Sequence, residues 1–174
     1  MRKEELRTYI ETHEAEMIED LESLIRIPSE KQAAEPGKPF GAPAAEALAQ
    51  GISILEKYGF AVTNYDNYAI AADFHQEEKG LDILAHLDVV PAGEGWQETD
   101  PFTPLVKDGK MFGRGTADDK GPAIAAIYAM RAVKELGYPL KKNVRLVLGS
   151  DEECGSSDLE YYYKKEVEAP CTFS

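Results

Sequence analysis

Three groups of side chains of the kinds that bind metal ions stand where an apolar segment ends or where a helix is expected to begin. They are His86 with Asp88, Asp118 with Asp119, and Asp151 with Glu152 and Glu153. A neutral imidazole and several carboxylates suit zinc, manganese or cobalt, and one carboxylate can bridge two ions. Such ions polarise a bound water or a substrate carbonyl, so this set of residues indicates a hydrolytic metal site.

The spacing of His86 and Asp88 has a physical reason. A histidine that binds a metal usually donates its other ring N–H to an acceptor, and a carboxylate two residues along an extended segment points to the same side. His86 is therefore a candidate metal ligand, and Asp88 is a candidate for the acceptor that fixes its ring.

Glu152 and Glu153 are adjacent, so in a strand their side chains would point to opposite sides. A strand that breaks at its end can turn both into one cleft. Their roles should then differ, because one carboxylate can bind a metal ion while its neighbour takes a proton from the water that the metal activates.

Each group also has an ordinary structural explanation. A single His-x-Asp occurs by chance in many proteins, an Asp-Asp pair before a helix is often an N-cap, and a Glu-Glu pair after a strand is usually solvated surface. The position of all three groups at breaks in an apolar framework favours the metal site. The spacing alone leaves both explanations open.

The segments that must position these groups alternate between helical and strand patterns. Helical spacing covers residues 3–26, 44–58 and 121–136, and short strand patterns cover 60–65, 68–75, 81–86 and 144–148. The Asp-Gly pair in "DGKMFGRG" predicts a hairpin turn. Two of the strands run directly into ligand-type residues. The pattern predicts one α/β domain, a mixed sheet flanked by helices with its polar clusters along one edge.

Composition excludes several classes of function. The chain has 174 residues and a net charge of −13, so its surface should repel nucleic acid and anionic membranes. An apolar run long enough to cross a bilayer is absent from the sequence, and the start "MRKEELRTYIETHE" is too charged for a signal peptide. The two cysteines give no disulfide framework. These features predict a cytoplasmic protein without a nucleic-acid or membrane partner.

The two other histidines have simpler interpretations. His13 lies on the apolar stripe of the first helical segment, which predicts a role in helix packing. His75 is followed by "QEEKG" and is predicted to be a surface residue at a strand end.

Longer motifs in the chain resemble those of a known family. The stretches "HLDVVPAGEGW", "DPFTP", "DGKMFGRGTADDKGP" and "SDEECGSSD" resemble, in order and spacing, the M20 family of metallopeptidases and deacylases. The resemblance implies a zinc-peptidase-like α/β catalytic domain. It also implies two divalent metal ions, with zinc favoured over manganese or cobalt, and hydrolysis of an amide by water held between them.

The resemblance extends to single residues. His86 resembles the histidine ligand of one metal, Asp118 the carboxylate that bridges both, and Glu153 a ligand of the other. Asp88 resembles the aspartate that orients the histidine, and Glu152 the general base. If the three ligands converge, their ligand atoms should lie within about 7 Å of one another.

The stretch "DDKGP" is similar to the dipeptidase branch of the family, which includes carnosinase-like and peptidase V-like enzymes. Deacylases of the family more often have methionine where this chain has Asp119, and glycine or alanine where it has Pro122. The resemblance therefore implies hydrolysis of dipeptides with a free amino end, with an N-acyl amino acid deacylase as the alternative. It also implies a cis peptide bond between Asp118 and Asp119.

Members of the family are much longer than this chain. They carry another metal-binding carboxylate shortly after the strand that "CTFS" resembles, and a further histidine near the C-terminus. We therefore expect residues 1–174 to be the N-terminal portion of a catalytic domain. An inactive folded or metal-binding fragment is the alternative of another class. Such a portion would self-associate through apolar surface that the remainder normally covers.

Overall fold

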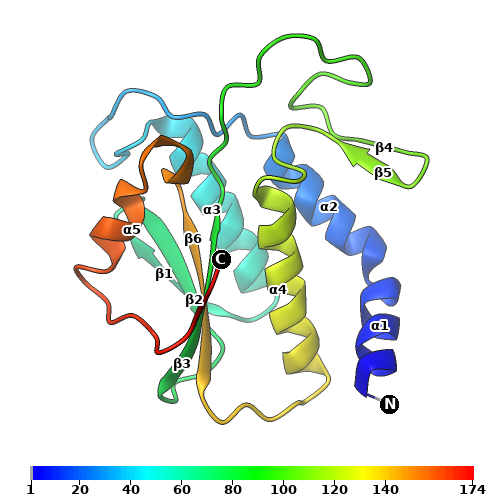
Figure 1. The fold of residues 1–174 in the computed structure, drawn as a ribbon, viewed down its shortest axis with the longest axis vertical. Helices are drawn as coiled ribbons and strands as arrows, with labels where there is room; N and C mark the ends of the chain where they lie inside the picture. The colour runs from blue at the N-terminus through cyan, green and yellow to red at the C-terminus, as the bar shows by residue number, and fades with distance from the viewer. Residues whose placement is uncertain (1) are drawn as a thin grey trace.

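Helices and strands alternate along residues 2–174, the part of the chain that the computed structural model describes (Figure 1). The helices are α1 (Arg2–Thr12), α2 (Glu14–Ile25), α3 (Ala42–Lys57), α4 (Lys120–Glu135) and α5 (Ser157–Tyr162), with a single 3-10 turn η1 (Glu152–Cys154). The strands are β1 (Ala61–Tyr65), β2 (Ala69–Asp73), β3 (Lys79–His86), β4 (Leu105–Lys107), β5 (Lys110–Phe112), β6 (Asn143–Gly149) and β7 (Thr172–Phe173).

Five strands form one mixed sheet in the order β1-β2-β6-β3-β7. Strand β3 is parallel to β6 and β7, whereas β1 and β2 are antiparallel to their neighbours. Because β3 and β6 run in the same direction, their carboxyl ends meet at one edge, where His86 is paired with Gly149. The segments that carry the ligand-type residues therefore leave the sheet side by side, as open α/β sheets arrange their binding edges.

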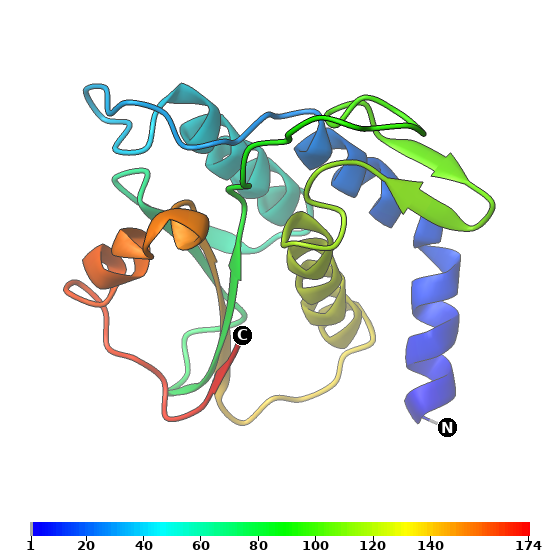
Figure 2. The same ribbon diagram turned by 45° about the horizontal axis from the view of Figure 1, so that its top comes forward.

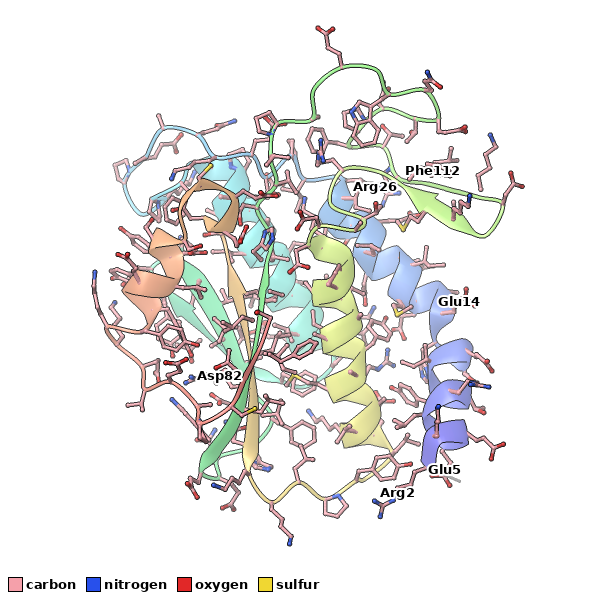
Figure 3. All side chains as sticks on the ribbon, viewed as in Figure 1. Arg2, Glu5, Glu14, Arg26, Asp82 and Phe112 are labelled. Atoms are coloured by element: carbon pink, nitrogen blue, oxygen red, sulfur yellow. The ribbon has the colours of Figure 1, made fainter. Side chains whose placement is uncertain are left out.

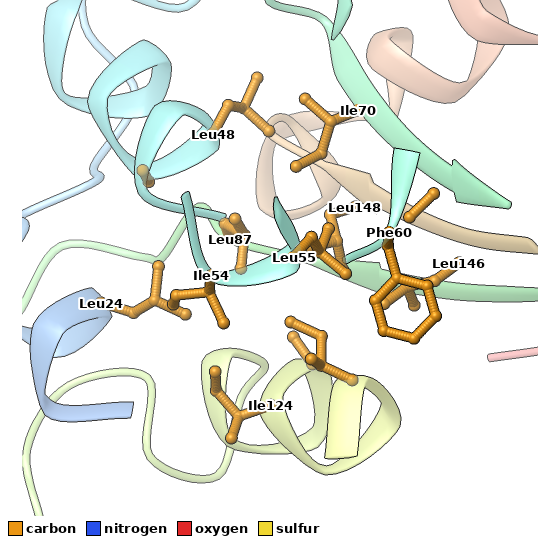
Figure 4. Close-up of a cluster of buried hydrophobic side chains, with 14 of the residues drawn as sticks. Leu24, Leu48, Ile54, Leu55, Phe60, Ile70, Leu87, Ile124, Leu146 and Leu148 are labelled. Atoms are coloured by element: carbon orange, nitrogen blue, oxygen red, sulfur yellow. The ribbon is translucent and has the colours of Figure 1, made fainter. Parts of the chain in front are cut away.

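Helices lie on both faces of the sheet (Figures 1 and 2). Helices α3 and α4 cover one face with α2 packed outside them, and α5 lies on the other face. The main core fills the first layer with fully buried side chains such as Leu48, Leu55, Ile124 and Leu146 (Figure 4). Each such side chain contributes about 1.5–3 kcal/mol when it is removed from water, so this layer fixes the sheet that carries the site.

The α/β fold with a mixed sheet flanked by helices is confirmed, and most element bounds lie within a few residues of the predictions. The predicted hairpin is present as β4 and β5, joined by Asp108 (φ 53°) and Gly109 (φ 71°). Both turn residues have positive φ, which Asp-Gly pairs adopt readily. Within residues 2–174, no helix combines the length and the apolar character needed to cross a membrane.

The N-terminal segment differs from the single predicted helix over 3–26. It forms two helices, because His13 leaves the helical conformation (φ −105°, ψ 11°). Its ring stacks on Tyr9 with centroids 4.1 Å apart, and its Nδ1 lies 2.7 Å from the Tyr9 carbonyl oxygen. The predicted packing role of His13 is therefore confirmed, but the packing accompanies a break in the helix.

His75 is half-buried, so its prediction as a surface residue is wrong. It does follow a strand end, just beyond β2. Its ring packs edge-on against Phe74, and its Nδ1 accepts the backbone N–H of Glu77 at 3.3 Å.

Candidate metal centre

A cavity of about 450 Å³ lies at the carboxyl ends of β3 and β6. Its lining includes His86, Asp118, Asp119, Glu152 and Asp158. The side chains of Asp118 and Glu152 are 73% and 53% exposed, whereas that of His86 is 10% exposed. The cavity thus presents carboxylates to solvent around a mostly buried imidazole.

The three predicted ligands converge at this edge of the sheet. His86, Asp118 and Glu153 each offer one ligand atom, and these atoms all lie within 4.8 Å of one another. The distance between His86 Nε2 and Asp118 Oδ1 is 3.2 Å. The predicted convergence within about 7 Å is confirmed.

Each of the three comes from a different element. His86 is the last residue of β3, Asp118 lies just before α4, and Glu153 belongs to η1, the turn that follows β6. The peptide bond between Asp118 and Asp119 is cis, as the family resemblance implies. The sheet therefore brings together residues that are up to 67 positions apart in the sequence.

Asp88 lies where the H-x-D spacing predicts. Its Oδ1 is 3.3 Å and its backbone oxygen 3.1 Å from Nδ1 of His86, and its side chain is buried. The same carboxylate accepts the backbone N–H groups of Glu152 and Glu153 at 3.3 and 3.1 Å. Asp88 thus contacts the imidazole and also the turn that carries the two glutamates.

The charges around His86 set its protonation. Burial lowers the pKa of His86, but the Asp88 carboxylate and the nearby Asp119 raise it by more than burial lowers it, to about 9. The ring is therefore a cation at neutral pH. A metal ion that bound at Nε2 would displace that proton, since only the neutral imidazole coordinates.

The two glutamates differ in exposure. Glu153 is half-buried, and burial together with the charge of Asp118 raises its pKa. Glu152 is more exposed, and its Oε2 lies 3.7 Å from His86 Nε2. Glu153 thus joins the ligand cluster, while Glu152 stays at the solvent side of the cavity.

Sequence reasoning missed three interactions around the site. Asp119 accepts the backbone N–H of His86 at 3.0 Å, although the Asp-Asp pair alone also fitted a helix cap. Lys31 donates to the buried Asp151 at 2.5 Å from a loop without periodicity. Asp158 is fully buried and accepts backbone N–H groups at the end of β6. Of the three, Asp158 had a signal, since it closes the motif "SDEECGSSD".

This α/β sheet with an imidazole and carboxylates gathered at its strand ends defines a domain with a candidate metal centre. Residues 83–170 match the model of peptidase family M20/M25/M40. The chain belongs to this family.

Relatives of known name are similar over most of the chain. A putative dipeptidase of Bacillus subtilis, YtjP, is 39% identical over 153 residues, which are 87% of this chain and 33% of that protein. A beta-Ala-Xaa dipeptidase of Lactobacillus delbrueckii subsp. lactis is 40% identical over 161 residues, 91% of this chain and 34% of that protein. Human carnosine dipeptidase 1 has a similar structure, with a TM-score of 0.79 and 31% identity over 94% of this chain and 38% of its own.

The chain spans about a third of the length of these curated relatives. The family match, the relatives and the similar structure together confirm the family and the fold. Activity, substrate and the identity of any metal ion are properties of a whole protein.

Proposed function

We propose that this chain provides part of the metal centre of a metal-dependent dipeptidase. The observation that carries the proposal is the convergence of His86, Asp118 and Glu153 within 4.8 Å. The donor set fits the proposed ions, because an imidazole nitrogen and carboxylate oxygens suit zinc, manganese or cobalt. The family resemblance favours zinc among them. His86 and Glu153 would each hold one of two ions, and Asp118 would bridge them.

Bound divalent ions would supply Lewis-acid polarisation of the peptide carbonyl and lower the pKa of the attacking water. The side chains have separate tasks. Glu152 takes the proton of the attacking water and gives it to the leaving amine, which suits its exposed position beside His86. Asp88 keeps the His86 ring oriented through its contact at Nδ1.

The proposed substrate is a dipeptide with a free amino end. Its support is the identity of 39% and 40% to relatives named as dipeptidases, together with the stretch "DDKGP". The activity is proposed for a protein of the relatives' length, with residues 1–174 as the N-terminal portion of its catalytic domain. Two bridged ions need roughly six or more protein ligand atoms, and the three residues above supply only some of them.

The test separates base from ligand within such a full-length protein. Glu152→Ala should lose most of kcat while its zinc content, measured by atomic absorption, stays that of the parent. Glu153→Ala should lose zinc as well as activity. Equal loss of zinc in both variants would refute the division of roles between the two glutamates.

A substrate panel tests the reaction itself. Dipeptides, β-alanyl dipeptides and N-acyl amino acids are offered to the full-length protein and to residues 1–174, with zinc, manganese or cobalt. Turnover of dipeptides by the full-length protein supports the proposal, whereas preference for N-acyl amino acids would make it a deacylase. Failure of both would favour a folded or metal-binding protein without this activity. We expect the 174-residue chain alone to be inactive.

A further inference from the structure

The turn that follows β6 carries the two glutamates, yet its own side chains contribute little to holding it. Glu152, Glu153 and Cys154 form a single 3-10 turn, and all three are exposed or half-buried. A single 3-10 turn has weak hydrogen bonds of its own. Its position must therefore be set by other groups.

Two buried aspartates hold the backbone of this segment. The carboxylate of Asp158 accepts the N–H groups of Ser150 and Asp151 on one oxygen, at 2.6 and 2.9 Å. Asp88 accepts the next two N–H groups along the chain, those of Glu152 and Glu153. Consecutive amides from 150 to 153 are thus all held by carboxylates, which are stronger acceptors than neutral oxygens.

Asp158 fits closely against the end of β6. It is fully buried, and its second oxygen accepts the N–H of Leu159 at 2.7 Å. A Cβ added to Gly149 would lie 2.3 Å from Asp158 Oδ2, whereas its next neighbour outside Asp158, the Ala85 carbonyl oxygen, would be 3.8 Å away. Glycine at 149 therefore leaves the room that this carboxylate occupies.

The far side of the same turn is closed by Asp151. Its buried carboxylate accepts the hydroxyl of Ser157 at 2.5 Å and the amine of Lys31 at 2.5 Å. The segment between Gly149 and Ser157 is thus fixed at both ends, and Asp158 holds the end that leaves the sheet.

We propose that Asp158 is a positioning residue for Glu152 and Glu153. By holding the amides of Ser150 and Asp151, it sets the direction in which the chain leaves β6 and so places both glutamates near His86. The inference rests on the proposed function for what the glutamates do there, but the placement of the turn can be measured without a metal.

The first experiment compares cobalt binding by folded variants of the 174-residue chain, followed through the visible absorption of Co²⁺. Asp158→Ala should weaken Co²⁺ affinity by about 10- to 100-fold and alter the absorption bands, because loss of an outer partner misplaces a ligand. The matched control is Asp20→Asn, another buried aspartate with several partners, on α2 and outside the cavity. It should lower the Tm but leave the Co²⁺ affinity and spectrum unchanged.

The second experiment is independent of metal binding. Amide hydrogen exchange of Glu152 and Glu153, measured by NMR with a chelator present, should be faster in Asp158→Ala than in the parent and unchanged in Asp20→Asn. If Asp158→Ala does not fold, Asp158→Asn takes its place, since its amide group must oppose one of the bound N–H groups. A folded variant with the parent's exchange rates at both glutamates would overturn the proposal.

The crowding at Gly149 gives a third measurement. Gly149→Ala should weaken Co²⁺ binding in the parent and have little further effect in the Asp158→Ala background, because the clash involves the Asp158 carboxylate. Equal effects in both backgrounds would contradict the proposed packing. If the 174-residue parent binds no Co²⁺, the same titration of a protein of the relatives' length tests the proposed metal centre, and the exchange rates still decide the role of Asp158.

Discussion

Strands β3 and β6 carry charged side chains at both ends of their parallel pair, and the two ends differ in how those charges are balanced. Away from the cavity, Asp82 on β3, which is labelled in Figure 3, is paired in register with Arg145 on β6. Both are at most 1% exposed and are joined by two hydrogen bonds of 2.8 and 2.6 Å. Asp82 also accepts the N–H of Ala169 at 3.0 Å. At this end the buried charges of Asp82 and Arg145 balance each other.

At the carboxyl end, the acidic groups outnumber the basic ones. Asp118, Glu152 and Glu153 surround the single imidazole of His86, and two of these carboxylates are mostly exposed. Buried charges that are paired within the chain depend on each other, because loss of one partner leaves the other uncompensated, whereas unbalanced charges at a cavity leave attraction for a cation. The buried pair of Asp82 and Arg145 therefore matters for folding, and the acidic cluster around His86 can attract a cation.

The largest expected effect on stability is at the buried pair of Asp82 and Arg145. Arg145→Met leaves the buried Asp82 without its partner and should lower the free energy of unfolding by about 3–5 kcal/mol. Urea denaturation measures it, and the double variant Asp82→Leu with Arg145→Met should recover part of the loss. His86→Ala, at the other end, should cost less in the same measurement, because Asp88 still accepts the backbone N–H groups of Glu152 and Glu153. If His86→Ala were the more damaging change, the assignment of the two ends would be wrong.

Zinc should reduce the difference in stability between His86→Ala and Arg145→Met. At a zinc concentration of about 100 times Kd, the parent should gain about 2.7 kcal/mol in its free energy of unfolding, because the ion binds the folded state. Thermal unfolding with and without a chelator measures the gain, and His86→Ala should lose it. Lys38→Met, in an exposed pair with Glu35, provides a control that keeps the gain. A zinc effect of equal size in His86→Ala would point to binding elsewhere.

A third prediction concerns the ion pair of Lys31 with Asp151, which lies near the cavity. Its amine contacts the fully buried Asp151, so Lys31→Met should cost about 1–2 kcal/mol. The exposed pair of Lys38 with Glu35 is the matched comparison, and Lys38→Met should cost about 0–1 kcal/mol. Chemical denaturation of both variants measures the difference. Equal losses would mean that burial of Asp151 adds nothing to the pair.

The smallest effect is a pH dependence of opposite sign at the two ends. Burial raises the pKa of Glu153. Its contribution to stability is therefore complete below the unfolded pKa of about 4.3 and is lost as the pH rises through the folded value. Glu153→Gln should accordingly gain stability relative to the parent as the pH rises from about 4 to about 7 in a chelator.

Glu166 should behave in the opposite way. A hydrogen bond from Lys79 lowers its pKa, so its stabilisation is present above the unfolded pKa and is lost as the pH falls through the folded value. Glu166→Gln should therefore lose stability relative to the parent as the pH rises from about 3 to about 5. Urea denaturation across the pH range measures both variants. If the stability of Glu153→Gln and of Glu166→Gln, each relative to the parent, changed in the same direction with pH, the proposed electrostatic difference between the two ends of the strand pair would be wrong.

The sequence predicts the sheet edge and the ligands because their signals are local. Apolar strands that end in ligand-type residues indicate His86 and the pair Glu152 and Glu153, and the family resemblance selects Glu153 as the ligand. The two-residue spacing places Asp88 beside the histidine. The contacts made by Asp158 and Lys31 have no such local signal. Asp158 lies in a short helix and Lys31 in a loop, and no periodic pattern marks either residue. The break at His13 was missed because apolar spacing continues on both sides of it.

The pairing of His86 with Gly149 has a consequence for how the protein acquires an ion during its synthesis. The ribosome makes His86 and Asp118 before it makes β6 and Glu153. Until β3 and β6 pair, the early ligands belong to a flexible nascent chain. Pairing across so many residues is slow because loop closure must come first. Stable capture of an ion must therefore follow the non-local step of folding, so free metal cannot guide the earlier steps.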